Sequence, residues 1–385
     1  MKFSLKIFSI SAAVMLLVFA AAAAEADSKT APVKSIKAAL YVDDGSAGNG
    51  VFYWAILLKH SPGITLELLN GADIRAGKLA GMDLLVMPGG MPGQQYNAMK
   101  EEGVAQLHKF LENGGSYVGT CAGLAGTLND QNRLRLLPFH RLPNSGGRVA
   151  NIHVEINKRG AELLGIEPGR IVARYAGGPI PKPGAKAHEI STGEVLAVYK
   201  NTVSYIDKPH GNQFNQPAII YGSFGKGKVI ATGFHPECWK STYHIAMGCI
   251  YAVTSFKSFP VVPLKSKHPY RAGYYTGGRN DIESVKAMLK LYSHDRITVK
   301  LLATQEINEG DLEQLDILVL PDASSKIYAS MAKNSFIQQQ IREFVKHGGK
   351  VFAAGKAQTA VPEGVQAVKV KSNEDINPDL LLKNF

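Results

Sequence analysis

The chain has 385 residues and a mass of 41.5 kDa, which leaves room for two or three domains of about 150 residues each. Hydrophobic residues make up 45% and charged residues 19%, so composition excludes a disordered, collagen-like or coiled-coil chain, and three cysteines exclude a disulfide scaffold or a multi-cysteine zinc module. Lys and Arg outnumber Asp and Glu by 43 to 32, a net charge of +11, but they are dispersed, so no nucleic-acid partner is expected.

The first 26 residues have the three parts of a secretory signal peptide. Lys2 and Lys6 give a positive start, residues 7–24 are apolar, and Ala24-Glu25-Ala26 fits the small-residue pattern of a cleavage site. A membrane anchor is the alternative, although the apolar run is shorter than the ~20 residues that a span needs. We expect the signal peptide to be cleaved and the mature chain to be periplasmic or secreted, without stable membrane insertion.

Strands and helices are predicted to alternate from residue 37 onward. Short apolar runs predict strands, and apolar residues repeated on one helical face predict helices. The strands are expected at 38–42, 64–68, 82–87 and 116–119, and the helices at 51–60 and 104–112. This alternation predicts an α/β fold with a doubly wound parallel sheet.

The same order of blocks returns about 233 residues later, which indicates a repeat. The second set of blocks lies at 271–275, 297–302, 315–321 and 347–352. We therefore predict a signal peptide, two related units and a linker rich in Pro and Lys, with bounds 1–26, 27–257, 258–269 (the linker) and 270–385. Between about 140 and 257 the first unit carries an extra β insertion without a counterpart in the shorter second unit.

The sequence Gly119-Thr120-Cys121-Ala122-Gly123 connects a predicted strand to a helix. A nucleophile on so sharp a turn needs small neighbours, and the helix start favours a thiolate while backbone N–H groups such as that of Ala122 face a developing oxyanion. A buried cysteine packed at a helix start is the alternative. The turn belongs to the carboxyl edge of the sheet, where ligands bind, so Cys121 is a candidate nucleophile.

A histidine motif strengthens that interpretation. Strands predicted at 217–222 and 228–233 form a hairpin whose second strand ends in His235-Pro236-Glu237. Residues two apart beyond a strand end can face the same way, so His235 can act as a base toward Cys121 while Glu237 orients its ring. A lone histidine is more often structural, but this combination is more specific.

These motifs together resemble the class I glutamine amidotransferase superfamily. Within it, the chain is most similar to the N-terminal domain of biotin–protein ligases and its stand-alone bacterial relatives, over residues 36–257. The resemblance rests on Tyr41-Val42-Asp43-Asp44-Gly45, Met87-Pro88-Gly89-Gly90, the Cys-Ala-Gly elbow, and residues 174–179, which are similar to a Tyr-x-Gly-Gly-Pro stretch of that family.

The resemblance implies a flavodoxin-like fold and a role for each member of a triad. Cys121 would be the nucleophile, His235 the base and Glu237 the residue that orients the base. The backbone of Gly89 and Gly90 would help to form the oxyanion hole. The sequence contains no recognisable biotin-ligase catalytic segment or ammonia-using synthase domain, so standard glutamine amidotransfer is not expected.

Further candidates for contact with substrate are weaker. Asp43 and Asp44 follow the first strand, where substrate would be met, but solvated turn acids are the alternative. Tyr175, Gly177 and Gly178 are candidates through the family-like stretch alone.

The remaining thiols and histidines suggest no cofactor. Cys238 and Cys249 are expected as buried thiols in a helix after the His-Pro-Glu loop, too far apart for a mutual disulfide. No His-x-x-x-His pair occurs, so neither a metal site nor a cofactor is indicated.

The second unit keeps the scaffold but lacks the nucleophile. Aligned through the shared Gly-Gly, Gly355 falls opposite Cys121, and Asp322 falls opposite Gly89. We expect this unit to be a structural or recognition partner of the first.

Two functional hypotheses follow. In the first, Cys121 attacks the carbonyl carbon of a small amide or peptide in the cell envelope, and water hydrolyses the resulting thioester. In the second, the chain is a non-catalytic periplasmic binding or scaffold protein with a relic triad. A deglycase or stress-chaperone role, as in other branches of the superfamily, ranks third, and an oligomer is left open.

Overall fold

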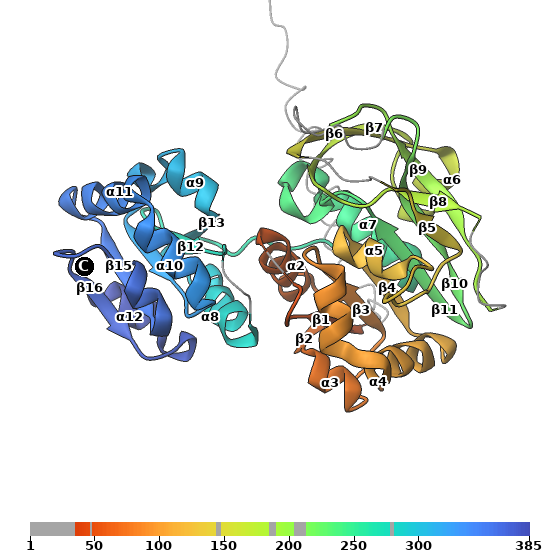
Figure 1. Cartoon of the computed structure of the whole chain (residues 1–385), viewed down its shortest axis with the longest axis horizontal. Coiled ribbons are helices and arrows are strands. Elements are labelled where there is room, and N and C mark those ends of the chain that lie inside the picture. The colour runs from red at the N-terminus through yellow and green to blue at the C-terminus, as the bar shows by residue number, and fades with distance from the viewer. Residues whose placement is uncertain (1–34, 47, 144–147, 185–189, 204–212, 278–280) are drawn as a thin grey trace, which may run out of the picture. The chain divides into compact units, whose positions relative to one another are not determined.

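Two parallel-stranded cores organise the chain, as the computed structural model shows in Figure 1. The structure describes residues 35–46, 48–143, 148–184, 190–203, 213–277 and 281–385. The predicted signal peptide therefore lies outside the described residues. The first sheet has nine strands in the order β2-β1-β3-β4-β11-β10-β9-β6-β7, and the second has five in the order β13-β12-β14-β15-β16.

The first half of the large sheet is parallel and the second half is antiparallel. The parallel strands are β2 (Ile64–Leu69), β1 (Ile36–Tyr41), β3 (Leu84–Met87), β4 (Ser116–Thr120) and β11 (Gly227–Thr232). The antiparallel extension, which is the predicted β insertion, consists of β10 (Pro217–Phe224), β9 (Glu194–Tyr199), β6 (Val149–Ile156) and β7 (Gly169–Ala176). A separate pair, β5 (Phe139–Arg141) and β8 (Pro181–Pro183), is also antiparallel.

Helices cover both faces of the parallel strands because neighbouring residues of these strands point to opposite sides, and apolar residues occur on both. Leu40 and Val86 pack with α2 (Asn49–Lys59) and α7 (Tyr243–Thr254) in one buried cluster. Tyr41 and Met87 pack with α4 (Pro92–Glu112) and α5 (Ala122–Thr127) in another. The short helices α3 (Gly71–Arg75) and α6 (Lys158–Leu164) complete this part of the chain. The predicted α/β class with a doubly wound sheet is thus confirmed.

The small sheet repeats the strand order of the parallel half and is parallel throughout. Its strands are β13 (Ile297–Leu302), β12 (Tyr270–Tyr275), β14 (Ile317–Leu320), β15 (Lys350–Ala354) and β16 (Ala367–Val370). The helices are α8 (Ile282–Ser293), α9 (Thr304–Asn308), α10 (Ser325–Lys333), α11 (Ser335–Lys346) and α12 (Pro378–Leu382).

Equivalent hydrogen bonds support the internal repeat. The Asp83 carboxylate accepts from the backbone N–H of Lys37 at 2.8 Å, and Asp316 accepts from that of Arg271 at 2.7 Å. Gly115 and Gly349 each lie against a phenylalanine ring five residues earlier in the chain, so close that a Cβ atom would come within 2.3 and 2.4 Å of it. Such details at matching positions indicate one scaffold used twice.

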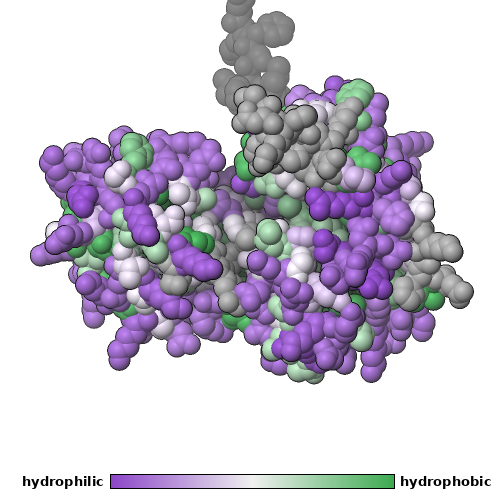
Figure 2. All heavy atoms as spheres, viewed as in Figure 1, coloured by the Kyte–Doolittle hydropathy of each residue, from purple (hydrophilic) through white to green (hydrophobic). Residues whose placement is uncertain are grey.

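Contacts between α2 and the second sheet make residues 36–385 one compact unit. The Phe52 and Tyr274 rings have centroids 5.6 Å apart, inside an apolar cluster that includes residues of both sheets. The boundaries that we predict at 257 and 270 remain predictions. On the face drawn in Figure 2, hydrophilic residues predominate over both parts.

Two helices differ from expectation. The helix predicted at 104–112 begins at Pro92, although the backbone at Lys100 is non-helical with φ of 56°. The prediction that one helix holds both Cys238 and Cys249 is wrong for Cys238. This residue lies in a separate 3-10 turn, Pro236–Cys238, because proline can begin such a turn. Within the described residues, the helices are too short or too polar to cross a membrane.

Candidate active site

The predicted elbow places Cys121 between β4 and α5 in a strained conformation. Its φ of 52° and ψ of −102° are unfavourable for any residue with a side chain. A Cβ atom on Gly119 would lie 2.7 Å from the Gly123 carbonyl carbon, and one on Gly123 would lie 2.2 Å from the Met87 oxygen. The glycines are therefore required by close backbone packing, which holds Cys121 at the carboxyl edge of the sheet.

Cys121 and His235 meet beside Gly89. A Cβ atom on Gly89 would lie 3.4 Å from Cys121 Cβ and 2.6 Å from His235 Cε1, so a side chain there would collide with the imidazole. His235 Nδ1 donates to Glu237 Oε1 at 2.8 Å, and the Glu237 side chain is fully buried. The structure thus brings the three predicted residues together in the predicted order.

The charges around His235 favour its protonated form. Burial opposes the imidazolium, but the Glu237 carboxylate and the Cys121 thiol outweigh this effect and raise the pKa of His235 well above its usual value. An imidazolium next to a thiol is the partner that a nucleophilic thiolate requires.

Three residues that sequence reasoning missed support the carboxylate. Trp54 Nε1 donates to Thr120 Oγ1 at 3.3 Å, and Thr120 Oγ1 donates to Glu237 Oε1 at 3.5 Å. A Cβ atom on Gly50 would lie 2.8 Å from the same carboxylate oxygen. Gly50 and Trp54 are four residues apart, so they share a face of the helix. This spacing is the one feature of the sequence that could have indicated their common position.

The family-like stretch at 174–178 contacts the triad through its backbone. The Arg174 carbonyl accepts from His235 N–H at 2.8 Å, and the Ala176 carbonyl lies 3.9 Å from Cys121 Sγ. Tyr175 is buried, and its hydroxyl donates to the Gly178 carbonyl at 2.6 Å. Gly177 has a φ of 71°, and a Cβ on Gly178 would collide with the Gly233 backbone. Tyr175, Gly177 and Gly178 therefore shape the loop beside the thiol.

The other predicted ligand contacts lie on the turn after β1. The Asp43 carboxylate accepts from Gly71 N–H at 2.9 Å, and the Asp44 carbonyl accepts from the Tyr41 hydroxyl at 2.8 Å. Ser46 on the same turn forms an isolated β-bridge with Gly90, whose φ is 140°. The turn thus supports the Gly89-Gly90 segment. Ala122 is the first residue of α5, where a backbone N–H has no partner within its helix.

This part of the chain matches a known family. Residues 79–125 and 139–252 match the family described as "Biotin-protein ligase, N terminal". The expected resemblance to this family is confirmed, and we call residues 79–125 and 139–252 the biotin-protein ligase N-terminal region, which contains the Cys121, His235 and Glu237 cluster.

Solved structures with similar folds come from several kinds of protein. PurLQS from Thermotoga maritima is 18% identical, covers 58% of this chain and 99% of its own, and has a TM-score of 0.42. A ThuA-like protein from Bacteroides uniformis is 16% identical, covers 60% and 98%, and has a TM-score of 0.43. A β-galactosidase from Bacillus circulans is 14% identical, covers 62% and 33%, and has a TM-score of 0.37. Among curated proteins, none matches the chain.

The other two cysteines of the biotin-protein ligase N-terminal region are buried, as expected. Burial and the nearby Glu237 raise the pKa of the Cys238 thiol, and burial raises that of Cys249. One donor atom each from His235, Glu237 and Cys238 lies within 4.8 Å of the others, close enough to surround a metal ion. Because His235 Nδ1 is hydrogen-bonded to Glu237, we interpret the group as part of the triad.

Outside the biotin-protein ligase N-terminal region, the second unit keeps the elbow but fills the nucleophile position. Gly355 has a φ of 49°, close to that of Cys121. A Cβ atom on Gly355 would lie 2.5 Å from the Asp322 carboxylate, which occupies that space and accepts from Lys356 N–H at 2.9 Å. The second elbow therefore has no room for a nucleophilic side chain.

Proposed function

We propose that this chain is a cysteine amidohydrolase that acts on a small amide or a peptide. The observation that carries this proposal is the convergence of three groups beside Gly89. Cys121 occupies a strained elbow, His235 lies next to it, and Glu237 fixes the ring through a 2.8 Å hydrogen bond. A structural cysteine needs neither the strained backbone nor an oriented histidine.

The proposed reaction has two stages. The proton of Cys121 resides on His235 in the resting pair, and the thiolate attacks the amide carbonyl carbon to form a tetrahedral intermediate. His235 then returns the proton to the leaving nitrogen as the C–N bond breaks, which leaves a thioester on Cys121. Water, deprotonated by His235, attacks the thioester, and the carboxylic acid is released with the thiol regenerated. Glu237 stabilises the imidazolium in both stages.

The backbone supplies a place for the oxyanion. The N–H of Ala122 follows the nucleophile directly, and Gly89 lies next to the side chains of Cys121 and His235. Preorganised N–H donors of this kind stabilise the charge that develops on the carbonyl oxygen. We assign this role to Ala122 and Gly90.

We also propose that the chain is exported and that its partners are envelope amides or peptides. The support is the sequence of residues 1–26, with its positive start, apolar run and Ala-x-Ala pattern. Detection of a mature N-terminus at residue 27 in an envelope fraction would test this part.

Alkylation tests the catalytic proposal. We expect iodoacetamide at pH 6.5 to modify Cys121 much faster than Cys238 or Cys249, whose burial raises the pKa of each thiol. His235→Asn should slow the alkylation of Cys121 without changing the rate at Cys249, which is the internal control. Peptide mapping by mass spectrometry measures all three sites, and an unchanged Cys121 rate in His235→Asn would contradict a functional pair.

A binding or scaffold function with a relic triad is the second candidate. It is favoured by the closed state of the site, since Cys121 is only 8% exposed and His235 6%. Reaction with p-nitrophenyl acetate separates the two functions. An enzyme should release nitrophenolate in a burst of about one equivalent and carry an acetyl group on Cys121, and Cys121→Ala should do neither. Absence of both in the wild-type chain would favour the binding protein.

A further inference from the structure

A cavity separate from the triad lies beside the carboxyl ends of β1 and β14. It has a volume of about 1380 Å³ and is lined by α2, β2 and α3 on one side and by α8 and the turns after β14 and β15 on the other. Cys121, His235 and Glu237 do not line it. Carboxyl ends of parallel strands are where α/β folds bind their ligands, so the position itself favours a binding site.

One end of the cavity is acidic and is held in place by a buried amide. Asn373, which is 3% exposed, donates to Asp281 Oδ1 at 3.4 Å and to the Asp322 carbonyl at 3.1 Å. The same side chain accepts from Asp322 N–H at 2.6 Å. Asn373 therefore connects the two aspartate-bearing turns. Both turns present a carboxylate to the cavity, Asp281 and Asp322, and a bound cationic group would interact favourably with these carboxylates.

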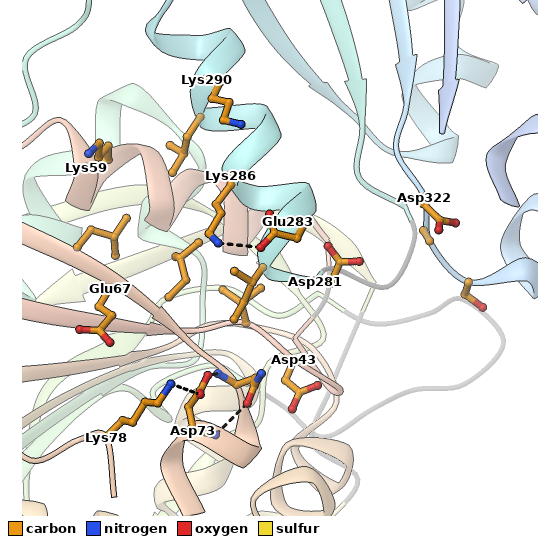
Figure 3. Close-up of a pocket in the computed structure, with 18 of the residues that line it drawn as sticks. Asp43, Lys59, Glu67, Asp73, Lys78, Asp281, Glu283, Lys286, Lys290 and Asp322 are labelled. Carbon is orange, nitrogen blue, oxygen red and sulfur yellow. Dashed lines mark hydrogen bonds and ion pairs between the residues drawn. The ribbon is translucent and has the colours of Figure 1, made fainter. Parts of the chain in front are cut away.

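The opposite end is basic. Lys286 and Lys290 are four residues apart on α8 and share a face of the helix, and Lys59 at the end of α2 lines the same cavity. Lys286 pairs with Glu283 at 2.7 Å, whereas Lys59 and Lys290 have no ion-pair partner within the described residues. In Figure 3, Lys59 and Lys290 lie to the left of Asp281 and Asp322.

Apolar side chains also line the cavity. Leu66 and Leu68 of β2 and Ile282 and Leu289 of α8 line the cavity. A ligand that satisfies all three parts carries a cationic group, an apolar middle and an anionic group. A phosphorylated ligand without an amine would satisfy the lysines but would be repelled by the aspartates.

We propose that this cavity binds a zwitterionic peptide, with its ammonium group at Asp281 and Asp322 and its carboxylate at Lys59 and Lys290. The second unit thereby recognises the ligand, and Asp322, whose carboxylate fills the space beside Gly355, contacts the ammonium group. The site is distinct from the triad and does not depend on thiol chemistry.

Calorimetry with the full chain carrying Cys121→Ala tests this proposal, because thiol chemistry is then absent. The probes are the tripeptide Ala-Leu-Ala with free termini, its N-acetyl form, its C-amide form and the doubly blocked form. We expect the free tripeptide to bind and the doubly blocked form to bind at least about ten-fold more weakly, since two charge-assisted contacts are lost.

Charge-neutral variants assign the two ends. Asp322→Asn keeps an acceptor for Lys356 N–H and should weaken the free tripeptide about five-fold, but should leave the N-acetyl form unchanged. Lys290→Gln should weaken the free tripeptide similarly and leave the C-amide form unchanged. Lys346→Gln, an exposed control on α11, should change nothing.

Two outcomes would overturn the proposal. One is no detectable binding of the free tripeptide at millimolar concentration, and the other is equal binding of free and blocked forms. Alkylation of Cys121 in the wild-type chain, measured separately, reports on the catalytic proposal alone.

Discussion

Gly89 is the residue on which the geometry of the triad depends most directly. Its missing side chain leaves the space that the His235 ring occupies, 2.6 Å from where a Cβ atom would be. The second unit shows the consequence of a side chain at the equivalent position, because the Asp322 carboxylate fills the elbow at Gly355. A side chain at this position is therefore incompatible with a nucleophile at the elbow.

Substitution of Gly89 by alanine should displace the imidazole. We expect Gly89→Ala to lower the free energy of unfolding by about 1–3 kcal/mol, because the added methyl group forces a shift in a packed site. Cys121 alkylation should slow by at least about ten-fold, because a displacement of the base by 1 Å already disrupts its function. Denaturant titration and mapped iodoacetamide labelling measure the two effects.

Gly93→Ala is the matched control for that experiment. Gly93 lies in α4, and a Cβ atom there would have no neighbour within 4 Å. This variant should be as stable as the parent or slightly more stable, since alanine favours a helix, and should label at the parental rate. A parental labelling rate in Gly89→Ala would show that the His235 position does not govern the thiol.

Helix α2 is the element that connects the triad to the rest of the fold. One face brings Gly50 against Glu237 and Trp54 against Thr120, and another packs Phe52 on Tyr274 of the second sheet. Helix α2 thereby holds Thr120, in the strand before the nucleophile, and the Glu237 carboxylate, which follows β11. This helix precedes both residues in the chain.

Trp54→Phe should weaken this support without removing any triad residue. The indole N–H that donates to Thr120 is lost and a smaller ring remains, so we expect a stability loss of about 1.5–3 kcal/mol. Loss of one positioning hydrogen bond should also slow Cys121 alkylation about five-fold. Phe52→Leu shrinks a buried aromatic residue on the same helix away from the triad, and should lose stability while labelling normally. Equal rates of Cys121 alkylation in Trp54→Phe and Phe52→Leu would argue against a positioning role for Trp54.

The sequence allowed the elements of the site to be predicted where the signal is local. Gly119 to Gly123 and His235 to Glu237 are short motifs whose spacing fixes their geometry, and the structure brings them together. The Trp54–Thr120 contact joins residues 66 positions apart, so no local pattern indicates it. The position of Cys238 is wrong because the prediction extends the helix that begins at Tyr243 back over the separate turn that Pro236 begins. The Asp281–Asn373–Asp322 cluster depends on three separate loops and was not predictable.

At the scale of the whole molecule, the last turn of α2 contacts α8 through His60. Its Nε2 atom lies 3.3 Å from Ser293 Oγ, its ring centroid lies 5.2 Å from that of Tyr292, and its carbonyl accepts from Val261 N–H. Burial, followed by the positive charges of Lys59 and Lys265, lowers the pKa of His60 below its usual value of 6.5. A neutral imidazole is therefore part of the contact between the two sheets.

Acidification should weaken this contact. Above pH 6.5 His60 is neutral in both the folded and unfolded chain, so its contribution is fully present. Between 6.5 and the lower folded pKa the unfolded chain binds more protons, and stability therefore falls as the pH falls. Because His60 is only partly buried and solvent screens its charge, we expect a loss of no more than about 0.5 kcal/mol. Denaturant unfolding measures the free energy of unfolding at pH 7.5 and 5.5. Its decrease between these pH values should be smaller in His60→Gln than in the parent. His347→Gln, which changes an exposed histidine after α11, should show the parental decrease. A parental decrease in His60→Gln would place the pH response elsewhere.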